Sequence, residues 1–296
     1  NPRDNVRPEL LQSAPGLALV STVNQIYKAE ILMKFTSISH IEKLKANGEK
    51  FSCLTAYDAS FANVMSEVGI DMILVGDSLG NVVQGQKTTV PVTLEQMEYH
   101  IECVSRGNQN CLIVGDMPYM SYSTPEEAYD TARRIMQAGA QMVKLEGGAW
   151  LLDTIQGLTV RGIPVCTHLG LTPQSVDALG GFKVQGRDDD GAQAMIDDAK
   201  SLEAAGARML VLECVPSDLA KQIAQELTIP VMGIGAGVDV DGQVLVLHDM
   251  LGISSFQAKF VRNFMADAKG DIKDAVKLYH DEVKAERFPA PEHSFE

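Results

Sequence analysis

The chain has 296 residues, of which 45% are hydrophobic and 22% are charged, and its formal net charge is −14. This length and composition are typical of a globular protein with one large domain or two average ones. The acidic balance argues against a nucleic-acid partner, because that binding needs clustered Lys and Arg. It also argues against binding to anionic membranes, and no stretch is apolar for long enough to predict a membrane span.

The first part of the chain lacks the basic start, apolar core and cleavage site of a signal peptide. Met33-Lys34-Phe35 resembles a natural start. We therefore interpret residues 1–32 as an N-terminal extension or leader without a catalytic role, and residues 33–296 as one catalytic domain.

The cysteines do not suggest disulfides or a zinc site. Most of them lie inside apolar runs, and none forms a CxxC pair. This pattern indicates buried, reduced thiols in a cytoplasmic protein. The cysteines are Cys53, Cys103, Cys111, Cys166 and Cys214.

Strand and helix patterns alternate along the chain. A short helical pattern runs from Ser37 to Ala46, and Asn47-Gly48 ends it. Short apolar segments rich in Val, Ile and Leu follow, as expected for strands buried on both faces of a parallel sheet. The predicted strands are Ser52–Tyr57, Met72–Asp77, Cys111–Asp116, Met142–Glu146, Pro164–His168, Met209–Glu213, Pro230–Gly235 and Gln243–His248.

Start and stop signals mark the helices between these strands. Thr124 is a predicted N-cap, followed by Pro125 and two glutamates, and Gly139 is a predicted C-cap. The region after Ser254 is expected to be helical, and the tail from Pro289 to be extended. Further predicted helices are Leu94–Arg106, Gly191–Ala205 and Leu219–Leu227, and predicted core positions of the last region are Phe260, Phe264 and Val276.

Eight strands alternating with helices, without a linker between them, predict an α/β fold. The leading architecture is a (β/α)8 TIM barrel in a single domain, with a short N-terminal helix and C-terminal helices. A doubly wound open sheet is the alternative. Polar residues at the ends of most strands favour the barrel, because those ends form its catalytic face. The long connection from Leu171 to Asp190 is a candidate lid over that face.

Two apolar strands end in Gly-Asp, which places Asp77 and Asp116 at matching positions. Glu146 ends a third strand. Mg²⁺ is commonly bound by one or two carboxylates, with water and substrate in its other positions. These residues therefore predict a magnesium site, although a lone Asp or Glu at a strand end is more often a surface charge.

The other ionisable strand ends allow several roles. Lys144 points the same way as Glu146, because side chains alternate along a strand. It is an ion-pair partner of Glu146, an anchor for a substrate carboxylate, or the Schiff-base lysine of an aldolase. Glu213 follows a wholly apolar run, where desolvation would make it a stronger base. His168 is more often a buried supporting residue than a proton carrier.

Together these motifs resemble the ketopantoate hydroxymethyltransferase family, and the resemblance runs from about Met33 to Glu296. Its most specific parts surround the strand ends already discussed. They are Thr55-Ala56-Tyr57-Asp58, Leu74-Val75-Gly76-Asp77-Ser78-Leu79-Gly80, Met142-Val143-Lys144-Leu145-Glu146-Gly147-Gly148, His168-Leu169-Gly170-Leu171-Thr172-Pro173-Gln174, Gly181-Phe182-Lys183-Val184-Gln185-Gly186-Arg187, Leu212-Glu213-Cys214-Val215-Pro216 and Gly233-Ile234-Gly235-Ala236-Gly237. The segment Gly252–Phe256 departs from the glycine-rich form expected there.

The resemblance implies transfer of a hydroxymethyl group from 5,10-methylenetetrahydrofolate to 3-methyl-2-oxobutanoate, with Mg²⁺, in pantothenate biosynthesis. It also implies a large homo-oligomer, commonly a decamer. By the same resemblance Asp77 and Asp116 hold the metal, and Glu146 supports it directly or through water. Ser78 and Lys144 contact the 2-oxo acid and Glu213 is the base, while the role of His168 is open.

Two other functions stay open at this point. One is a Schiff-base aldolase that uses Lys144. The other is a barrel without catalytic activity that binds a small anion or serves as an assembly subunit.

Overall fold

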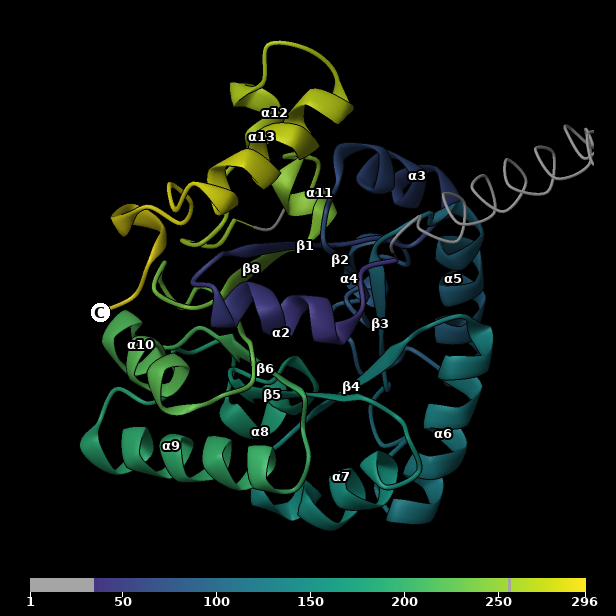
Figure 1. Cartoon of the computed structure of the whole chain (residues 1–296), viewed down its shortest axis with the longest axis vertical. Helices are drawn as coiled ribbons and strands as arrows, with labels where there is room; N and C mark the ends of the chain where they lie inside the picture. The colour runs from purple at the N-terminus through teal and green to yellow at the C-terminus, as the bar shows by residue number, and fades with distance from the viewer. Residues whose placement is uncertain (1–34, 255–256) are drawn as a thin grey trace, which may run out of the picture. The chain divides into compact units, whose positions relative to one another are not determined.

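The computed structural model describes residues 35–254 and 257–296. Within them, eight parallel strands close into a barrel in chain order, and β8 pairs with β1 (Figure 1). This confirms the predicted (β/α)8 barrel and excludes the open sheet. The strands are β1 (Phe51–Thr55), β2 (Met72–Val75), β3 (Leu112–Asp116), β4 (Met142–Glu146), β5 (Val165–Gly170), β6 (Met209–Glu213), β7 (Val231–Ile234) and β8 (Gly242–Leu245).

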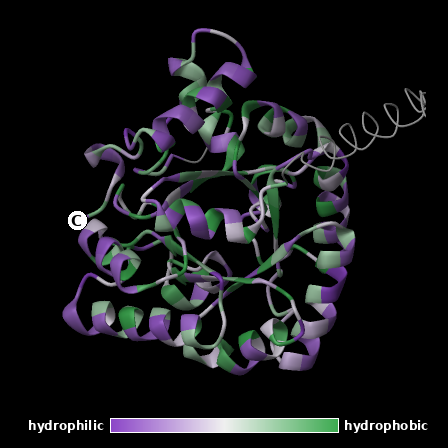
Figure 2. Ribbon diagram, viewed as in Figure 1, coloured by the Kyte–Doolittle hydropathy of each residue, from purple (hydrophilic) through white to green (hydrophobic). Residues whose placement is uncertain are grey.

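The strands are buried on both faces, as their apolar runs predict. All residues of β1, β2, β3, β4, β7 and β8 are buried. Figure 2 shows hydrophobic colour along the strands, whereas the outer helices carry hydrophilic residues as well. One side of each strand fills the barrel interior, and the other side packs under the surrounding helices.

Capping residues fix the starts of the main helices. Thr124 and Glu127 form a reciprocal capping box at α6, and Thr93 and Gln96 form one at α5. Gly139 ends α6 with φ 121°, a conformation that favours glycine. The longer helices are α2 (Ile38–Ala46), α3 (Ala59–Val68), α5 (Leu94–Gly107), α6 (Pro125–Ala138), α7 (Leu152–Thr159), α9 (Asp189–Ala204), α10 (Ser217–Glu226) and α13 (Ile272–Lys284).

The predicted N-terminal helix is α2, and it lies at the amino-terminal end of the barrel. Ile38, Ile41 and Leu44 are buried in the core. The Lys45 ammonium group contacts the Asp241 carboxylate at 2.8 Å, just before β8 begins. This end is therefore closed by α2, and the carboxyl ends of the strands are left to form a site.

The last predicted strand was too long at its carboxyl end. Strand β8 ends at Leu245, and His248 lies in the short helix α11 (Leu247–Met250). The connection from Leu171 to Asp190, the candidate lid, has secondary structure of its own. It contains the 3-10 turn η2 (Pro173–Ser175) and the short helix α8 (Val176–Leu179), and its last residues begin α9. Other short elements are α4 (Leu79–Val82) and the 3-10 turn η1 (Ala149–Leu151).

The C-terminal region is less helical than predicted. Helix starts only at α12 (Phe264–Asp267), and the tail contains the 3-10 turn η3 (Pro291–His293) instead of being extended throughout. The core positions were right, since Phe260, Phe264 and Val276 are all buried. The proposed extension, residues 1–32, lies outside the described residues.

The structure also bears on the cysteines and on the apolar length of the helices. All five cysteines are free, and only Cys103 is not fully buried. Among the described residues, no helix is both long and apolar enough to cross a membrane.

Candidate active site

The register of the barrel brings the predicted site residues together. Asp116 on β3 pairs with Lys144 on β4, and Glu146 pairs with His168 on β5. Glu213 ends β6 and pairs with Gly170. Neighbouring strands therefore deliver these side chains to one carboxyl-terminal edge, as expected for a barrel mouth.

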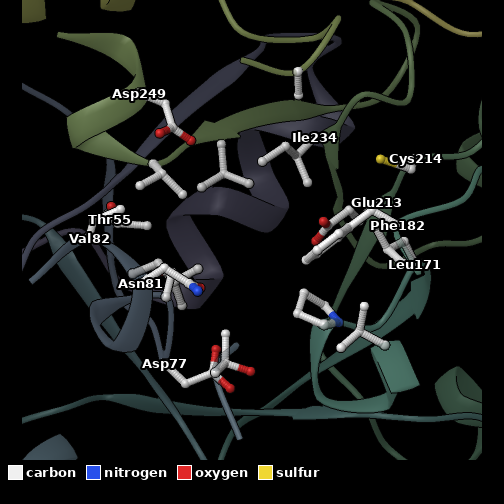
Figure 3. A pocket seen from close by; sticks show the side chains of 18 of the residues that line it. Thr55, Asp77, Asn81, Val82, Leu171, Phe182, Glu213, Cys214, Ile234 and Asp249 are labelled. Carbon is white, nitrogen blue, oxygen red and sulfur yellow. The ribbon is translucent and has the colours of Figure 1, made fainter. Parts of the chain in front are cut away.

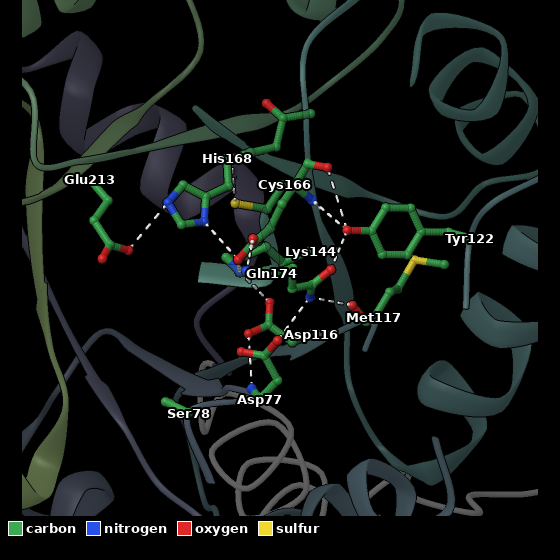
Figure 4. Close-up of polar contacts among 12 residues, drawn as sticks. Asp77, Ser78, Asp116, Met117, Tyr122, Lys144, Cys166, His168, Gln174 and Glu213 are labelled. Atoms are coloured by element: carbon green, nitrogen blue, oxygen red, sulfur yellow. Dashed lines mark hydrogen bonds and ion pairs between the residues drawn. The ribbon is translucent and has the colours of Figure 1, made fainter. Parts of the chain in front are cut away.

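These side chains form a continuous chain of alternating charge (Figure 4). Lys144 Nζ lies 2.5 Å from Asp116 Oδ1 and 3.4 Å from Glu146 Oε1. His168 Nδ1 lies 3.2 Å from Glu146 Oε1, and its Nε2 lies 3.4 Å from Glu213 Oε2. Every carboxylate in this polar chain has a cationic or ionisable nitrogen beside it.

Asp77 lies next to this chain, after the end of β2. Its backbone N–H donates to Asp116 Oδ2 at 3.1 Å. A Cβ at Gly76 would lie 2.9 Å from Ser78 Oγ and 3.3 Å from Asp116 Oδ2, so glycine leaves room for this approach. Ser78 follows at the start of α4, and its hydroxyl lies 2.9 Å from the Tyr57 hydroxyl.

Two contributors to the site were missed from the sequence. Gln174 donates from Nε2 to Asp77 Oδ2 at 2.9 Å, and its backbone N–H donates to Glu146 Oε2 at 3.1 Å. Tyr122 donates to Gln174 Oε1 at 2.5 Å. Gln174 stands in a motif quoted for the family resemblance, which was a usable signal. No pattern singled out Tyr122.

Burial disfavours the charged forms of both Asp77 and Lys144, but the neighbouring carboxylates act on the two groups in opposite ways. Burial, with repulsion from Asp116 and Glu146, raises the pKa of Asp77 to about 8. Burial alone disfavours a charged lysine, but Asp116 and Glu146 raise the pKa of Lys144 well above its ordinary value. Lys144 is therefore a firmly protonated cation, whereas Asp77 has too little positive charge near it.

Glu146 and His168 form an ion pair in the middle of the cluster. Burial opposes the ionisation of Glu146, but Lys144 and His168 lower its pKa to about 2. Burial likewise opposes a charged imidazole, yet Glu146 and Glu213 raise the pKa of His168 to about 9. At neutral pH His168 is thus a cation, and its Nδ1 is committed to Glu146.

Glu213 is less buried than its apolar strand predicted. Its side chain is 15% exposed and lines a cavity of about 820 Å³ at the barrel mouth (Figure 3). His168 Nε2, which faces it, makes no hydrogen bond of good geometry within the described residues. Asp77, Ser78, Asp116, Lys144, Glu146 and His168 line the same cavity.

The residues present fit a divalent cation. When all are ionised, the four carboxylates of Asp77, Asp116, Glu146 and Glu213 face only the two cations Lys144 and His168, which leaves a net charge of −2. Too little positive charge lies near Asp77 and Asp116 to balance both carboxylates. The oxygens of Glu146, in contrast, already have hydrogen-bond partners. No group of three ligand side chains lies in metal-binding geometry among the described residues. Mg²⁺ does not need three, because water and substrate supply its other ligands.

A closed (β/α)8 barrel with ionisable side chains gathered at the carboxyl ends of its strands defines a barrel enzyme. The model of the ketopantoate hydroxymethyltransferase family matches residues 35–291. The chain belongs to this family, and it is a transferase enzyme.

Similar curated proteins cover nearly the whole barrel. A 3-methyl-2-oxobutanoate hydroxymethyltransferase from Idiomarina loihiensis is 58% identical over 261 residues, which are 88% of this chain and 98% of that protein. The protein of the same name from Colwellia psychrerythraea is 59% identical over 265 residues, covering 89% of this chain and all of its own length.

More distant solved structures share the fold alone. A 2,3-dimethylmalate lyase, described as a member of the PEP mutase/isocitrate lyase superfamily, has a TM-score of 0.53 and 17% identity. The match covers 73% of this chain and 83% of that protein. A phosphoenolpyruvate phosphomutase from Streptomyces platensis subsp. rosaceus has a TM-score of 0.56 and 13% identity over the same shares of the two chains.

Proposed function

We propose that this enzyme transfers the one-carbon unit of 5,10-methylenetetrahydrofolate to 3-methyl-2-oxobutanoate and forms 2-dehydropantoate. The observation that carries this proposal is the match of 88–89% of the chain to relatives named as 3-methyl-2-oxobutanoate hydroxymethyltransferases. In the reaction, C3 of the 2-oxo acid loses a proton and forms a bond to the one-carbon unit. A water molecule supplies the hydroxyl oxygen, and tetrahydrofolate leaves.

The cluster offers a binding place for the 2-oxo acid. Lys144 is a protonated amine at the cavity wall, and Ser78 presents a hydroxyl beside Asp77. These groups suit the carboxylate and the keto oxygen of a small 2-oxo acid. Asp77 and Asp116 would hold Mg²⁺, which supplies Lewis acidity that favours loss of the C3 proton.

Glu213 is the base in this proposal. It is the carboxylate of the cluster with the greatest access to the cavity, so it can reach a carbon acid bound there. The imidazolium of His168 lies 3.4 Å away and balances the charge of its carboxylate. His168 thus positions Glu213 without touching the substrate carbon.

The assay that tests this function combines the enzyme with 3-methyl-2-oxobutanoate and methylenetetrahydrofolate, with and without Mg²⁺. We expect 2-dehydropantoate, detected by mass spectrometry, and its loss after exhaustive chelation. Full activity after chelation would contradict the metal requirement. Absence of product with both substrates and Mg²⁺ would contradict the function itself.

The Schiff-base aldolase is disfavoured by the surroundings of Lys144. A lysine nucleophile has to be neutral, whereas this amine is held between Asp116 and Glu146. Borohydride reduction in the presence of a 2-oxo acid separates the two chemistries. We expect no covalent adduct, and an adduct on Lys144 would establish the aldolase.

A further inference from the structure

The cavity at the barrel mouth has a second polar wall. Its volume of about 820 Å³ falls in the range of about 300–1,000 Å³ for drug-sized ligands, so a small 2-oxo acid would fill only part of it. Asp249 and His248 on α11 and Thr89 after α4 line another part of the wall. Figure 3 shows Asp249 on the side of the cavity opposite Asp77.

Three residues of this wall each contain a buried polar atom without a partner. Asp249 is 7% exposed and Thr89 is 4% exposed. Within residues 35–254 and 257–296, Asp249 Oδ1, His248 Nδ1 and Thr89 Oγ1 are buried without a hydrogen-bond partner. Buried polar atoms are nearly always paired. These three unpaired atoms belong to residues that line one cavity, where a ligand, with a small shift of the covering side chains, would supply the missing hydrogen bonds.

The fold holds this wall in place. The N–H of Leu247, the first residue of α11, donates to Thr55 Oγ1 at 2.9 Å and so ties the helix to β1. Leu247 and Met250 are buried in the core. The Asp249 carboxylate also has a hydrogen bond with the side chain of Ser254. Its position is therefore set before any ligand arrives.

The cavity that Asp249 lines also has apolar walls. Val244, Val246, Ile253 and Phe260 all line the same cavity. Burial raises the pKa of Asp249 above its ordinary value, so donors facing this carboxylate would favour its charged form. The matching ligand is a flat ring system with adjacent N–H donors on one edge.

We propose that Asp249 accepts hydrogen bonds from the pterin ring of the folate, with Thr89 and His248 bonding its other polar atoms. This inference rests on the proposed function, in which a folate is the one-carbon donor. The pterin edge carries an N3–H and a 2-amino group side by side, which match the two oxygens of a carboxylate. The folate then lies across the cavity from the charged cluster, with its one-carbon unit directed toward the 2-oxo acid.

The first test measures tetrahydrofolate binding by calorimetry to the wild type and to Asp249→Asn. The amide keeps the shape of the side chain but replaces one acceptor by a donor. We expect at least about a tenfold rise in Kd, as for loss of a charge-assisted hydrogen bond. The matched control is Asp153→Asn on the exposed first turn of α7, for which Kd should not change. An unchanged Kd in Asp249→Asn overturns the proposal.

The second test separates a direct contact from an effect through Ser254. Wild-type protein should bind 2-desamino-tetrahydrofolate about tenfold more weakly than tetrahydrofolate, because one donor is missing. Asp249→Asn should lose this discrimination. If the variant binds both ligands more weakly by the same factor, Asp249 acts only on the loop and the pterin assignment is wrong.

Product formation distinguishes this inference from the function on which it rests. Wild-type protein that discriminates the two folates through Asp249 but yields no 2-dehydropantoate supports the subsite and contradicts the proposed function. Wild-type protein that yields product while Asp249→Asn binds tetrahydrofolate normally retains the function and overturns the subsite. Failure of the wild type to bind tetrahydrofolate also overturns the subsite.

Discussion

At the scale of single residues, some side chains of the site could be predicted from the sequence and others could not. The positions of Asp77, Asp116 and Glu213 could be predicted because each lies at or just after the end of an apolar strand, and parallel strands share one carboxyl edge. Gln174 and Asp249 could not be placed, because their contacts depend on the paths of η2 and α11 after the strands have ended. Periodicity carries no information on such turns.

Replacement of Glu213 by Gln should slow proton removal strongly and leave the fold intact. A general base contributes about 10²–10⁴-fold to the rate, so exchange of the C3 proton of 3-methyl-2-oxobutanoate with deuterated solvent should slow by that factor. NMR measures this exchange without folate. Glu126→Gln on the exposed surface of α6 is the matched control. Exchange at the wild-type rate in Glu213→Gln would exclude this base.

At the scale of elements, strands were easier to predict than the segments between them. The bounds of β4 and β6 agree with the prediction because apolar runs end abruptly there. The short helices α4 and α8 were missed, since four residues do not cover enough turns to show a helical period. Close packing between helices was invisible as well, because it joins distant parts of the chain.

Helices α3 and α5 approach closely at Gly107. A Cβ at this position would lie 2.0 Å from the carbonyl oxygen of Ala59, which is backbone and has no rotamer to change. Gly107→Ala should therefore destabilise the protein by about 1–3 kcal/mol, as overpacking does. Urea unfolding measures the change. Gly191→Ala in α9 is the control and should be neutral or slightly stabilising, and equal effects at both sites would refute the packing argument.

Helix α13 docks on the barrel through His280, whose Nδ1 lies 2.8 Å from Ser52 Oγ. Burial lowers the pKa of His280 below its ordinary value near 6.5. The Asp71 carboxylate opposes this shift, and the Lys284 ammonium group adds to it. The unfolded state then binds the proton more readily, so stability is full above about pH 6.5 and falls as the pH drops below it.

Chemical unfolding of the wild type and His280→Gln between about pH 5 and 8 checks this linkage. The variant should lose less stability on acidification than the wild type does. A wild-type acid dependence that remains unchanged in His280→Gln would assign the effect to other groups.

At the scale of the whole molecule, the barrel carries an excess of negative charge at its mouth when no cation is bound. Binding of Mg²⁺ by Asp77 and Asp116 should raise Tm. The free energy of unfolding should rise by about 2.7 kcal/mol at a Mg²⁺ concentration 100 times Kd. Thermal scans with and without Mg²⁺ measure this shift. Asp77→Asn should remove it and should be more stable than the wild type in chelator, because it lacks the repulsion from Asp116 and Glu146. An equal Mg²⁺ shift in the variant would place the cation elsewhere.

The alternating charges also bear on how the barrel chooses its strand pairing. In the native register Asp116 lies opposite Lys144, and Glu146 lies opposite His168. A slip of β4 by two residues keeps every apolar side chain facing its proper side, so the hydrophobic pattern alone does not penalise it. That slip would set Asp116 against Glu146 or against Met142, which leaves like charges together or a buried carboxylate alone. The charged cluster therefore favours the native register of β4 over these two slipped registers.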